Sequence, residues 1–395
     1  MNLTSAKFAV CLAAVTACTA RTADESTVPQ RHLSEPDAAY PEALGMIQTV
    51  RALPDGRVLV ADPLGQVLVA IDMDAGTADT IGRRGAGPGE YDQPDAVFPL
   101  PGDSTLLIDL GNGRLTVLGP DLEPGATMPF AFGDPQGGDM LFILPRGTDR
   151  HGRLYFQGMG IKMGGPGLVE FPDSAPIMRF DRETKSIDTV GMIRLRRREA
   201  FTSGTGAGLS VEVAEYALSP EDAWHVSPNG RVAAARTDGY YVEWIDDDGS
   251  HPGPDVPYIG VPVRRADQDE WINDFYAMSM SLQVRIVSNV RTTSFSRGGP
   301  GSDDRPGPEG FEWPDAKPPF ITNGVRVSPS GEAWVHRSIP VGAEVVYDVF
   351  DADGYRTEQV IFPRGRRVVG FGGEFVYAVR KDEFDLFWLE RYRRF

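Results

Sequence analysis

The stretch LPDGRVLVADPLGQVLVAIDMDAGTADTIG, residues 53–82, decides the fold class. Its apolar and β-branched residues gather in short runs such as VLVAD and VLVAID, and turn-forming residues bound each run. The PDG at its start places a glycine where a turn needs a positive φ angle. Short runs separated by turns predict antiparallel β-strands.

The same plan returns along the rest of the chain. A turn with Gly, Asp or Asn precedes a β-rich run, and a second turn and a second run follow. Each unit offers about four strands, and so small a sheet cannot bury both faces alone. Stacking copies around an axis buries them, so the repeat predicts an all-β, six-bladed β-propeller. The six units are residues 53–82, 101–130, 149–158 with 175–193, 227–249, 328–362 and 370–392.

A family resemblance supports this fold. The segment GRVLVADPLGQVLVAIDMDAGTADTIGRRGAGPGEYDQP, residues 56–94, resembles an NHL-type blade, as found in six-bladed, TolB-like propellers of bacterial lipoproteins. The resemblance covers about residues 45–395. It implies that this range is the propeller domain, but a fold of this kind does not by itself give a function.

The first residues predict an export signal. Lys7 precedes a short apolar run, residues 8–15, which is too short to span a bilayer. Val15-Thr16-Ala17-Cys18 resembles a lipobox, so residues 1–17 are a predicted lipoprotein signal peptide and Cys18 is the predicted lipidation site. The alternative is a secretory signal that is cut elsewhere. The resemblance implies a lipid-anchored protein of the cell envelope, on the outer membrane or the periplasmic face.

Residues 18–44 are polar, without a helix or strand period, and predict a tether. The last repeat is short and lacks a fourth strand. In propellers the N-terminal segment often completes the final blade. We therefore expect a segment within VPQRHLS, residues 28–34, to close the ring.

The glycine-rich stretch TIGRRGAGPGEYDQP, residues 80–94, has the look of a phosphate-binding loop. A P-loop needs a Lys and a Ser or Thr after its glycines, and then a helix. Here Glu90 and Tyr91 follow, and Pro94 opposes a helix. The loop is expected to join one blade to the next, and RGGPGSDDRPGPEG, residues 297–310, is interpreted in the same way.

One insertion between blades four and five predicts a helix, over about residues 266–288. Trp271, Phe275, Met278 and Leu282 fall on one stripe at helical spacing, and Asp267 with Glu270 forms a candidate capping box. The stripe predicts packing against the propeller, and the alternative is a lid.

Composition and motifs exclude some classes of function. The net charge is −17, which argues against general nucleic-acid binding. No catalytic motif stands out, and the five histidines are scattered. DMDAG (72–76), DDDG (246–249) and DADG (351–354) lack the ligand ladder of a calcium loop and predict hairpin turns. The basic run RLRRRE, residues 194–199, predicts a solvated loop or a contact for an anionic partner.

Aligning the repeats predicts a candidate ligand site. The second strand of each unit ends at an equivalent position, and in a propeller these ends gather on one face around the central tunnel. The arginines among them could grip a carboxylate or phosphate. The alternative is that the acids bond nearby backbone amides and the arginines pair with acids. The six residues are Asp62, Asp109, Gln157, Arg236, Arg337 and Arg380.

The leading prediction is a non-catalytic binding or scaffold protein. It would hold a small anionic ligand or a peptide, or dock another envelope protein, and would be attached to the membrane by its lipid. The alternative is a propeller hydrolase or lyase with a divalent metal such as calcium in the tunnel, for which Asp62, Asp109 and Asn112 are the neighbouring candidates. A purely structural docking domain is a third reading.

Overall fold

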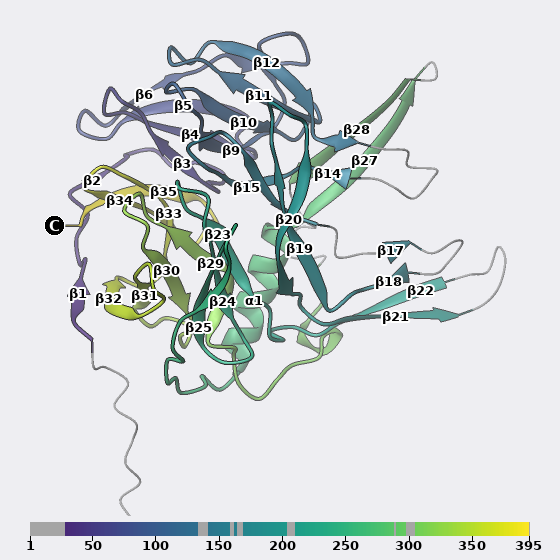
Figure 1. The fold of residues 1–395 in the computed structure, drawn as a ribbon, viewed down its shortest axis with the longest axis vertical. Coiled ribbons are helices and arrows are strands. Elements are labelled where there is room, and N and C mark those ends of the chain that lie inside the picture. Colours follow the sequence, from purple (N-terminus) through teal and green to yellow (C-terminus); the bar gives the residue numbers. More distant parts are fainter. Residues whose placement is uncertain are drawn as a thin grey trace, which may run out of the picture.

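The computed structural model describes residues 28–132, 141–158, 162–163, 169–203, 210–287, 290–297 and 305–394. Its main body is a ring of six antiparallel sheets, five with four strands and one with an added parallel fifth strand, which confirms the six-bladed propeller (Figure 1). The predicted signal peptide and Cys18 lie outside the described residues, as does part of the loop at 297–310.

Each blade is built from strands that follow one another along the chain, with the first strand at one edge of its sheet. Blade one has β3 (Val50–Ala52), β4 (Val58–Asp62), β5 (Val67–Asp72) and β6 (Thr77–Thr80). Blade two has β9 (Pro94–Pro99), β10 (Thr105–Asp109), β11 (Arg114–Leu118) and β12 (Pro124–Pro129). Blade three has β15 (Pro145–Thr148), β16 (Leu154–Gln157), β19 (Ser174–Phe180) and β20 (Ile187–Arg194).

The other three blades follow the same order. Blade four has β23 (Ala223–Val226), β24 (Val232–Arg236), β25 (Tyr241–Asp246) and β26 (Gly249–Pro252). Blade five has β29 (Phe320–Val327), β30 (Ala333–Arg337), β31 (Val345–Phe350) and β32 (Arg356–Phe362). Blade six has β33 (Arg366–Gly372), β34 (Phe375–Lys381) and β35 (Phe387–Arg393).

The strands are almost wholly apolar because both faces of each sheet are buried. Side chains alternate along β4: Val58 and Val60 pack toward blade six, while Leu59 and Ala61 pack toward blade two. The core accordingly consists of six apolar clusters, one between each pair of neighbouring blades. This arrangement explains why short apolar runs decided the fold class.

Ring closure differs from the expectation. The segment predicted to complete the last blade forms β1 (Gln30–His32), which instead adds a parallel fifth strand to β32 of blade five. The fourth strand of blade six is β2 (Ala38–Ala39), which pairs antiparallel with β35. The prediction of 28–34 was therefore wrong. The anchors of the closing segment, Tyr40 and Leu44, lie further along the chain and enter the core between blades six and one.

The helix between blades four and five is confirmed, but it is shorter than expected. Helix α1 covers Arg265–Ala277, and Arg264 is its N-cap rather than Asp267. Asp267 is the third residue of the helix, and its Oδ2 accepts a hydrogen bond from the Arg264 backbone N–H at 2.9 Å. None of the helices in the described part of the chain is long and apolar enough to cross a membrane.

Residues 280–287, which the helical stripe included, form strand β27 (Met280–Val287), paired with β28 (Val290–Arg297). The helical spacing of Met278 and Leu282 was coincidental, because MSLQVRIV alternates with the two-residue period of a strand. This hairpin and the β17–β18 and β21–β22 hairpins extend from the ring (Figure 1). Their strands are β17 (Lys162–Met163), β18 (Val169–Glu170), β21 (Arg198–Ser203) and β22 (Ser210–Glu215).

The remaining short elements connect blades. The glycine loop at 80–94 contains β7 (Arg83–Arg84) and β8 (Glu90–Tyr91), a parallel pair that links β6 of blade one to β9 of blade two. Its Glu90 carboxylate accepts a hydrogen bond from the Gly87 N–H at 2.8 Å, which confirms a structural connection. The others are β13 (Ala131–Phe132), β14 (Leu141–Phe142) and the 3₁₀ helix η3 (Pro308–Gly310).

Candidate functional site around the ring axis

The two acids of the predicted ring are engaged by the fold. Asp62 ends β4 and is 2% exposed. Its carboxylate accepts hydrogen bonds from four backbone N–H groups, those of residues 45, 46, 64 and 65. Asp109 ends β10 and accepts hydrogen bonds from the Asp92 N–H at 2.9 Å and from Asn112 Nδ2 at 2.7 Å. Burial raises the pKa of Asp109, and these hydrogen bonds oppose that rise.

The three predicted arginines each pair with an acid of their own blade. Arg236 ends β24 and forms ion pairs with Asp222, at 2.9 Å, and with Glu243. Arg337 ends β30 and lies 3.5 Å from Asp348. Arg380, near the end of β34, lies 3.4 Å from Glu390. These contacts match the local-pairing alternative, and a shared ligand site for the six residues stays a prediction.

Gln157 is half-buried at the end of β16. A cleft of about 280 Å³ lies beside Arg236 in blade four. The Arg236 guanidinium is already bonded there, because it also donates to the Met192 carbonyl at 2.8 Å. The cleft has both signs of charge in its lining: Arg194, Asp222, Arg236, Asp238, Tyr241 and Glu243.

The acids proposed for a metal site hold turns. The Asp62 and Asp109 carboxylates accept the hydrogen bonds given above. The third candidate, Asn112, uses its Nδ2 to donate to Asp109 and to the Gly85 carbonyl at 2.9 Å. Across the part of the chain that the structure describes, no group of three or more His, Cys, Asp or Glu side chains is placed to hold a metal ion. The aspartate-rich turns at 72, 246 and 351 each use their first carboxylate to bond turn amides, as predicted for hairpins.

A different set of residues gathers at the ring axis, on the first strands of four consecutive blades. Arg146 lies on β15, His225 on β23, Arg326 on β29 and Arg367 on β33. We call Arg146, Arg326 and Arg367 the axial arginines. A β-bulge between Pro145 and Gly147 re-aims the chain at Arg146. All four side chains are half-buried, so they are neither packed in the core nor on the outer surface.

The axial arginines lack carboxylate partners. Arg326 Nη1 donates to the carbonyls of Asn323, at 3.1 Å, and Val325, at 2.9 Å, while its Nε has no partner in the described part of the chain. Arg367 Nη2 donates to the Ile47 carbonyl at 2.8 Å. Among the described residues, no hydrogen bond or ion pair is found for Arg146, whose guanidinium lies 5.5 Å from the ring centre of Trp224.

Other arginines of the described chain do pair with acids. The chain has 56 acidic residues against 39 lysines and arginines, so acids are in excess. Arg297, which also lies near the axis, is bonded twice to Asp95, at 2.5 and 3.0 Å. Arg391 pairs with both Asp37 and Asp74. Within the described ranges, these two arginines have carboxylate partners, whereas no ion pair with a carboxylate is found for the three axial arginines.

The pKa directions agree with an accumulation of positive charge. Burial lowers the pKa of Arg326 to about 10, with the charges of Arg367 and Arg146 contributing to the decrease. Burial also lowers the pKa of Arg146 and of Arg367. The pKa of His225 falls to about 3 through burial, with Arg326 and Arg146 adding to the effect. At neutral pH the arginines are charged and the imidazole is neutral.

Helix α1 lies close to this cluster, near the middle of the ring in Figure 1. It is tied to three blades: Asp274 bonds Lys381 at 2.9 Å, Gln48 donates to the Met278 sulfur at 3.4 Å, and Lys317 pairs with Asp267 at 2.6 Å. Asp274 is near enough to raise the pKa of Arg367 against the effect of burial. The helix therefore packs at the end of the ring where the first strands begin.

The predicted apolar stripe packs against the propeller in one part: Met278 contacts the apolar cluster between blades six and one, whereas Trp271 and Phe275 contact the segment that precedes blade five. Trp271 and Phe275 stack at 4.9 Å, and Phe311 and Trp313 pack edge-on against Trp271. Arg196, from the basic run, lies 4.9 Å from the Phe275 ring centre and pairs with Glu215. Part of the basic run is thus engaged by aromatic rings and acids of the same chain.

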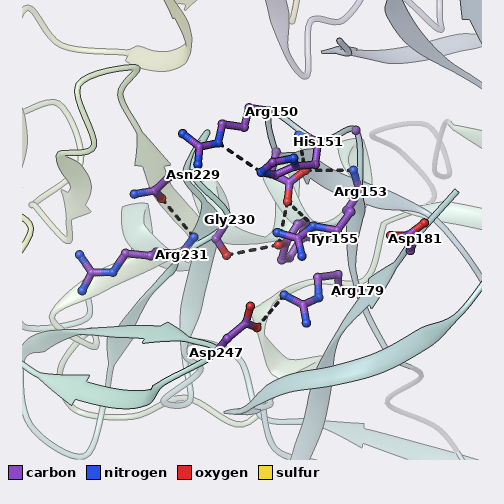
Figure 2. A network of polar contacts seen from close by, with 12 residues as sticks. Arg150, His151, Arg153, Tyr155, Arg179, Asp181, Asn229, Gly230, Arg231 and Asp247 are labelled. Atoms are coloured by element: carbon purple, nitrogen blue, oxygen red, sulfur yellow. Dashed lines mark hydrogen bonds and ion pairs between the residues drawn. The ribbon is translucent and has the colours of Figure 1, made fainter. Parts of the chain in front are cut away.

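A polar network fixes the opposite end of β15 (Figure 2). The Asp149 carboxylate accepts hydrogen bonds from the His151 N–H, from Arg153 Nε at 2.6 Å and from the Tyr155 hydroxyl at 3.1 Å. The Arg150 N–H donates to the Pro228 carbonyl of blade four at 2.8 Å. These bonds join blades three and four, and so hold Arg146 and His225 on rigid neighbouring strands.

The sequence-based search missed the axial arginines because it compared the ends of second strands. Each lies inside a first-strand run, in LPRGT, GVRVS and GRRVV. The sequence feature that could have revealed them is an arginine within an apolar strand, since arginine is rarely buried unless it has a partner. Only the ring shows that these three strands meet at one axis.

Comparison with known proteins adds the fold alone. Neither a scan of protein-family models nor a search of curated protein sequences found a match. A solved gluconolactonase from Xanthomonas campestris is similar, with 11% identity over 90% of this chain and 91% of that chain, at a TM-score of 0.40. A calcium-binding protein, regucalcin, from Agrobacterium tumefaciens has 10% identity over 92% and 96%, at 0.35. A streptogramin B lyase has 9% identity over 90% and 97%, at 0.35.

Proposed function

We propose that this chain is a non-catalytic binding protein whose ring axis holds a small anion. The single observation that supports this proposal is the set of three axial arginines without carboxylate partners among the described residues. Like charges brought together in a partly desolvated site raise the free energy of the empty protein. A bound anion would supply the missing partner through charge-assisted hydrogen bonds.

The test is thermal melting of the protein with a panel of small anions. A ligand at 100 times its dissociation constant adds about 2.7 kcal/mol to the free energy of unfolding. We expect a rise in melting temperature that is lost in Arg326→Met. The matched control is Arg57→Met, because Arg57 already pairs with Asp55 and Asp79 on a turn. A rise that persists in Arg326→Met would contradict an axial site.

We further propose that the protein is an NHL-type, TolB-like lipoprotein of the bacterial cell envelope, anchored through Cys18. The lipobox-like Val15-Thr16-Ala17-Cys18 and the blade-like residues 56–94 support this proposal. Labelling of cells with a fatty-acid analogue should mark the wild-type protein and fail to mark Cys18→Ser. Equal labelling of the two would overturn the anchor.

A further inference from the structure

The directions from which the axial arginines approach the axis restrict the shape of the ligand. They come from blades three, five and six, and therefore from separate parts of the ring wall. A carboxylate is planar, and a single guanidinium fork can satisfy its two oxygens. A tetrahedral oxyanion has oxygens that point out of any one plane. Guanidinium groups from several walls can therefore bind it at the same time.

The local charge restricts the ligand further. The nearby acids are bonded to other groups: Asp95 is bonded twice to Arg297, and Asp274 is bonded to Lys381. Glu221, whose charge raises the pKa of Arg146 against the effect of burial, accepts a hydrogen bond from the Thr322 hydroxyl at 3.1 Å. The three guanidinium charges are therefore only partly offset by nearby acids. A group with two negative charges compensates them better than a group with one.

His225 supplies a neutral neighbour. Its ring lies against Gly147, next to Arg146: a Cβ on Gly147 would lie 3.7 Å from both Cε1 and Nε2 of the imidazole. The same Cβ would meet Val226 at 2.6 Å, so glycine is required for this close approach. His225 Nδ1 has no hydrogen-bond partner among the residues that the structure describes. A neutral imidazole can donate one hydrogen bond to an oxyanion without adding a charge.

We infer that the axial arginines bind a doubly charged tetrahedral oxyanion, a phosphate or sulfate group, with His225 beside it. This inference rests on the proposed function and names its ligand class. The group is either a free anion or the end of a larger ester, and both present the same oxygens to the site.

Isothermal titration of the full-length protein tests the inference. The probes are inorganic phosphate, sulfate and glycerol 3-phosphate, against acetate, gluconate and succinate. We expect phosphate or sulfate to bind at least about tenfold more tightly than any carboxylate, a difference of about 1.4 kcal/mol. Binding of glycerol 3-phosphate would identify an ester ligand, and binding of the free anions alone would identify a free oxyanion. Either outcome supports the ligand class.

Titrations at several pH values test whether the ligand must carry two negative charges, because phosphate esters and sulfate differ in how their charge depends on pH. A phosphate monoester takes up its second proton near pH 6, whereas sulfate stays doubly charged. The affinity for glycerol 3-phosphate should therefore fall between pH 8 and pH 5.5, relative to that for sulfate in the same buffers. An unchanged ratio would contradict the requirement for two charges.

Variants make the two proposals distinguishable. Arg326→Met should reduce oxyanion affinity by at least about tenfold, and Arg57→Met should leave it unchanged. If Arg326→Met does not fold, Arg367→Lys serves in its place, because lysine keeps the charge and loses the planar fork. Carboxylates that bind as tightly as phosphate, with the same dependence on Arg326, would overturn the ligand class alone. Absence of any arginine-dependent anion binding would overturn both proposals.

Discussion

At the scale of single residues, the axial arginines predict a conflict between stability and binding. Arg326 has an unbonded Nε, and its pKa is lowered by burial and by two other arginines. Replacing a whole buried ion pair with apolar residues is often neutral or stabilising, by up to about 4 kcal/mol. Replacing Arg326 breaks no ion pair among the described residues and removes the cost of keeping its charge out of water. Arg326→Met should therefore melt at a higher temperature than the wild type when no ligand is present.

The measurement is a calorimetric scan of both proteins in an anion-poor buffer. Arg297→Met is the matched comparison near the axis, because it leaves Asp95, which is 4% exposed, without its partner. Breaking a buried pair from one side should lower stability by about 3–5 kcal/mol. If both variants lose stability alike, Arg326 has a structural partner and is not held ready for a ligand.

Two buried histidines predict how stability depends on pH. Burial lowers the pKa of His225 and of His336 to about 3 each. In the unfolded chain each takes up a proton near pH 6.5, while the folded state stays neutral. Because the unfolded state then binds more protons, stability falls as the pH drops from about 6.5 toward 3, by up to about 1.4 kcal/mol per pH unit for each histidine.

Urea unfolding of the wild type and of His336→Gln between pH 7 and pH 5 measures this slope. The range stays above the usual pKa of the carboxylates, so the histidines dominate the change. The slope should be shallower in His336→Gln. His251→Gln is the control, because His251 is exposed in a hairpin. A slope that is equal in all three proteins would contradict neutral buried histidines.

At the scale of elements, the anchoring of α1 depends on one acid. Asp267 is 4% exposed and pairs with Lys317, which is 9% exposed. Burial alone would raise the pKa of Asp267, but Lys317 and the Arg264 amide lower it overall. Asp267→Asn should destabilise the helix by about 3–5 kcal/mol, because it leaves the Lys317 ammonium buried and unpaired.

Hydrogen exchange of the backbone amides in residues 265–277 reports this loss directly. Asp269→Asn is the matched control on the same helix, since its ion pair with Arg265 is exposed. An exposed pair contributes only about 0–1 kcal/mol. Equal protection in Asp267→Asn and Asp269→Asn would show that the aromatic contacts alone hold α1.

Elements could be predicted from the sequence wherever local pattern and tertiary environment agree. The blades follow from apolar runs and turn residues, because burial on both faces leaves that pattern in every strand. The end of α1 was mispredicted, because Met278 and Leu282 fit a helical stripe by chance. Strands β1 and β2 have only three and two residues, too few for a pattern, so their pairing partners are set by the ring and not by their own sequence.

The candidate site was the least predictable part, because it too depends on the tertiary arrangement and not on local sequence pattern. Asp62 and Asp109 looked like ligand residues, yet the turns next to them need acceptors for their amides. Arg146, Arg326 and Arg367 are about 40 to 220 residues apart in the chain. Their approach to one axis depends on the number and order of blades, which a local pattern does not contain.

At the scale of the whole molecule, the net charge and the charge at the ring axis have opposite signs. The chain carries a net charge of −17, while the axial arginines carry positive charge without ion-paired acids among the described residues. The outer field repels an anion at long range, and the axial arginines attract it at short range. Salt screens the long-range part over about 10 Å at 0.1 M. The surface charge therefore acts on the rate of association more than on the bound state.

Ring closure gives the last prediction, because a propeller with an open edge loses the contact between its first and last blades. Compared with a chain that starts at residue 28, one that starts at residue 35 loses β1, the ion pair of Arg31 with Glu358 and the buried side chain of Leu33. A chain that starts at residue 45 also loses β2 and the buried side chains of Tyr40 and Leu44. Burial of one such side chain contributes about 1.5–3 kcal/mol and burial of two about 3–6 kcal/mol. The further fall in melting temperature from the second truncation should therefore exceed the fall from the first, and a second truncation that costs nothing more would show that β1, not β2, closes the ring.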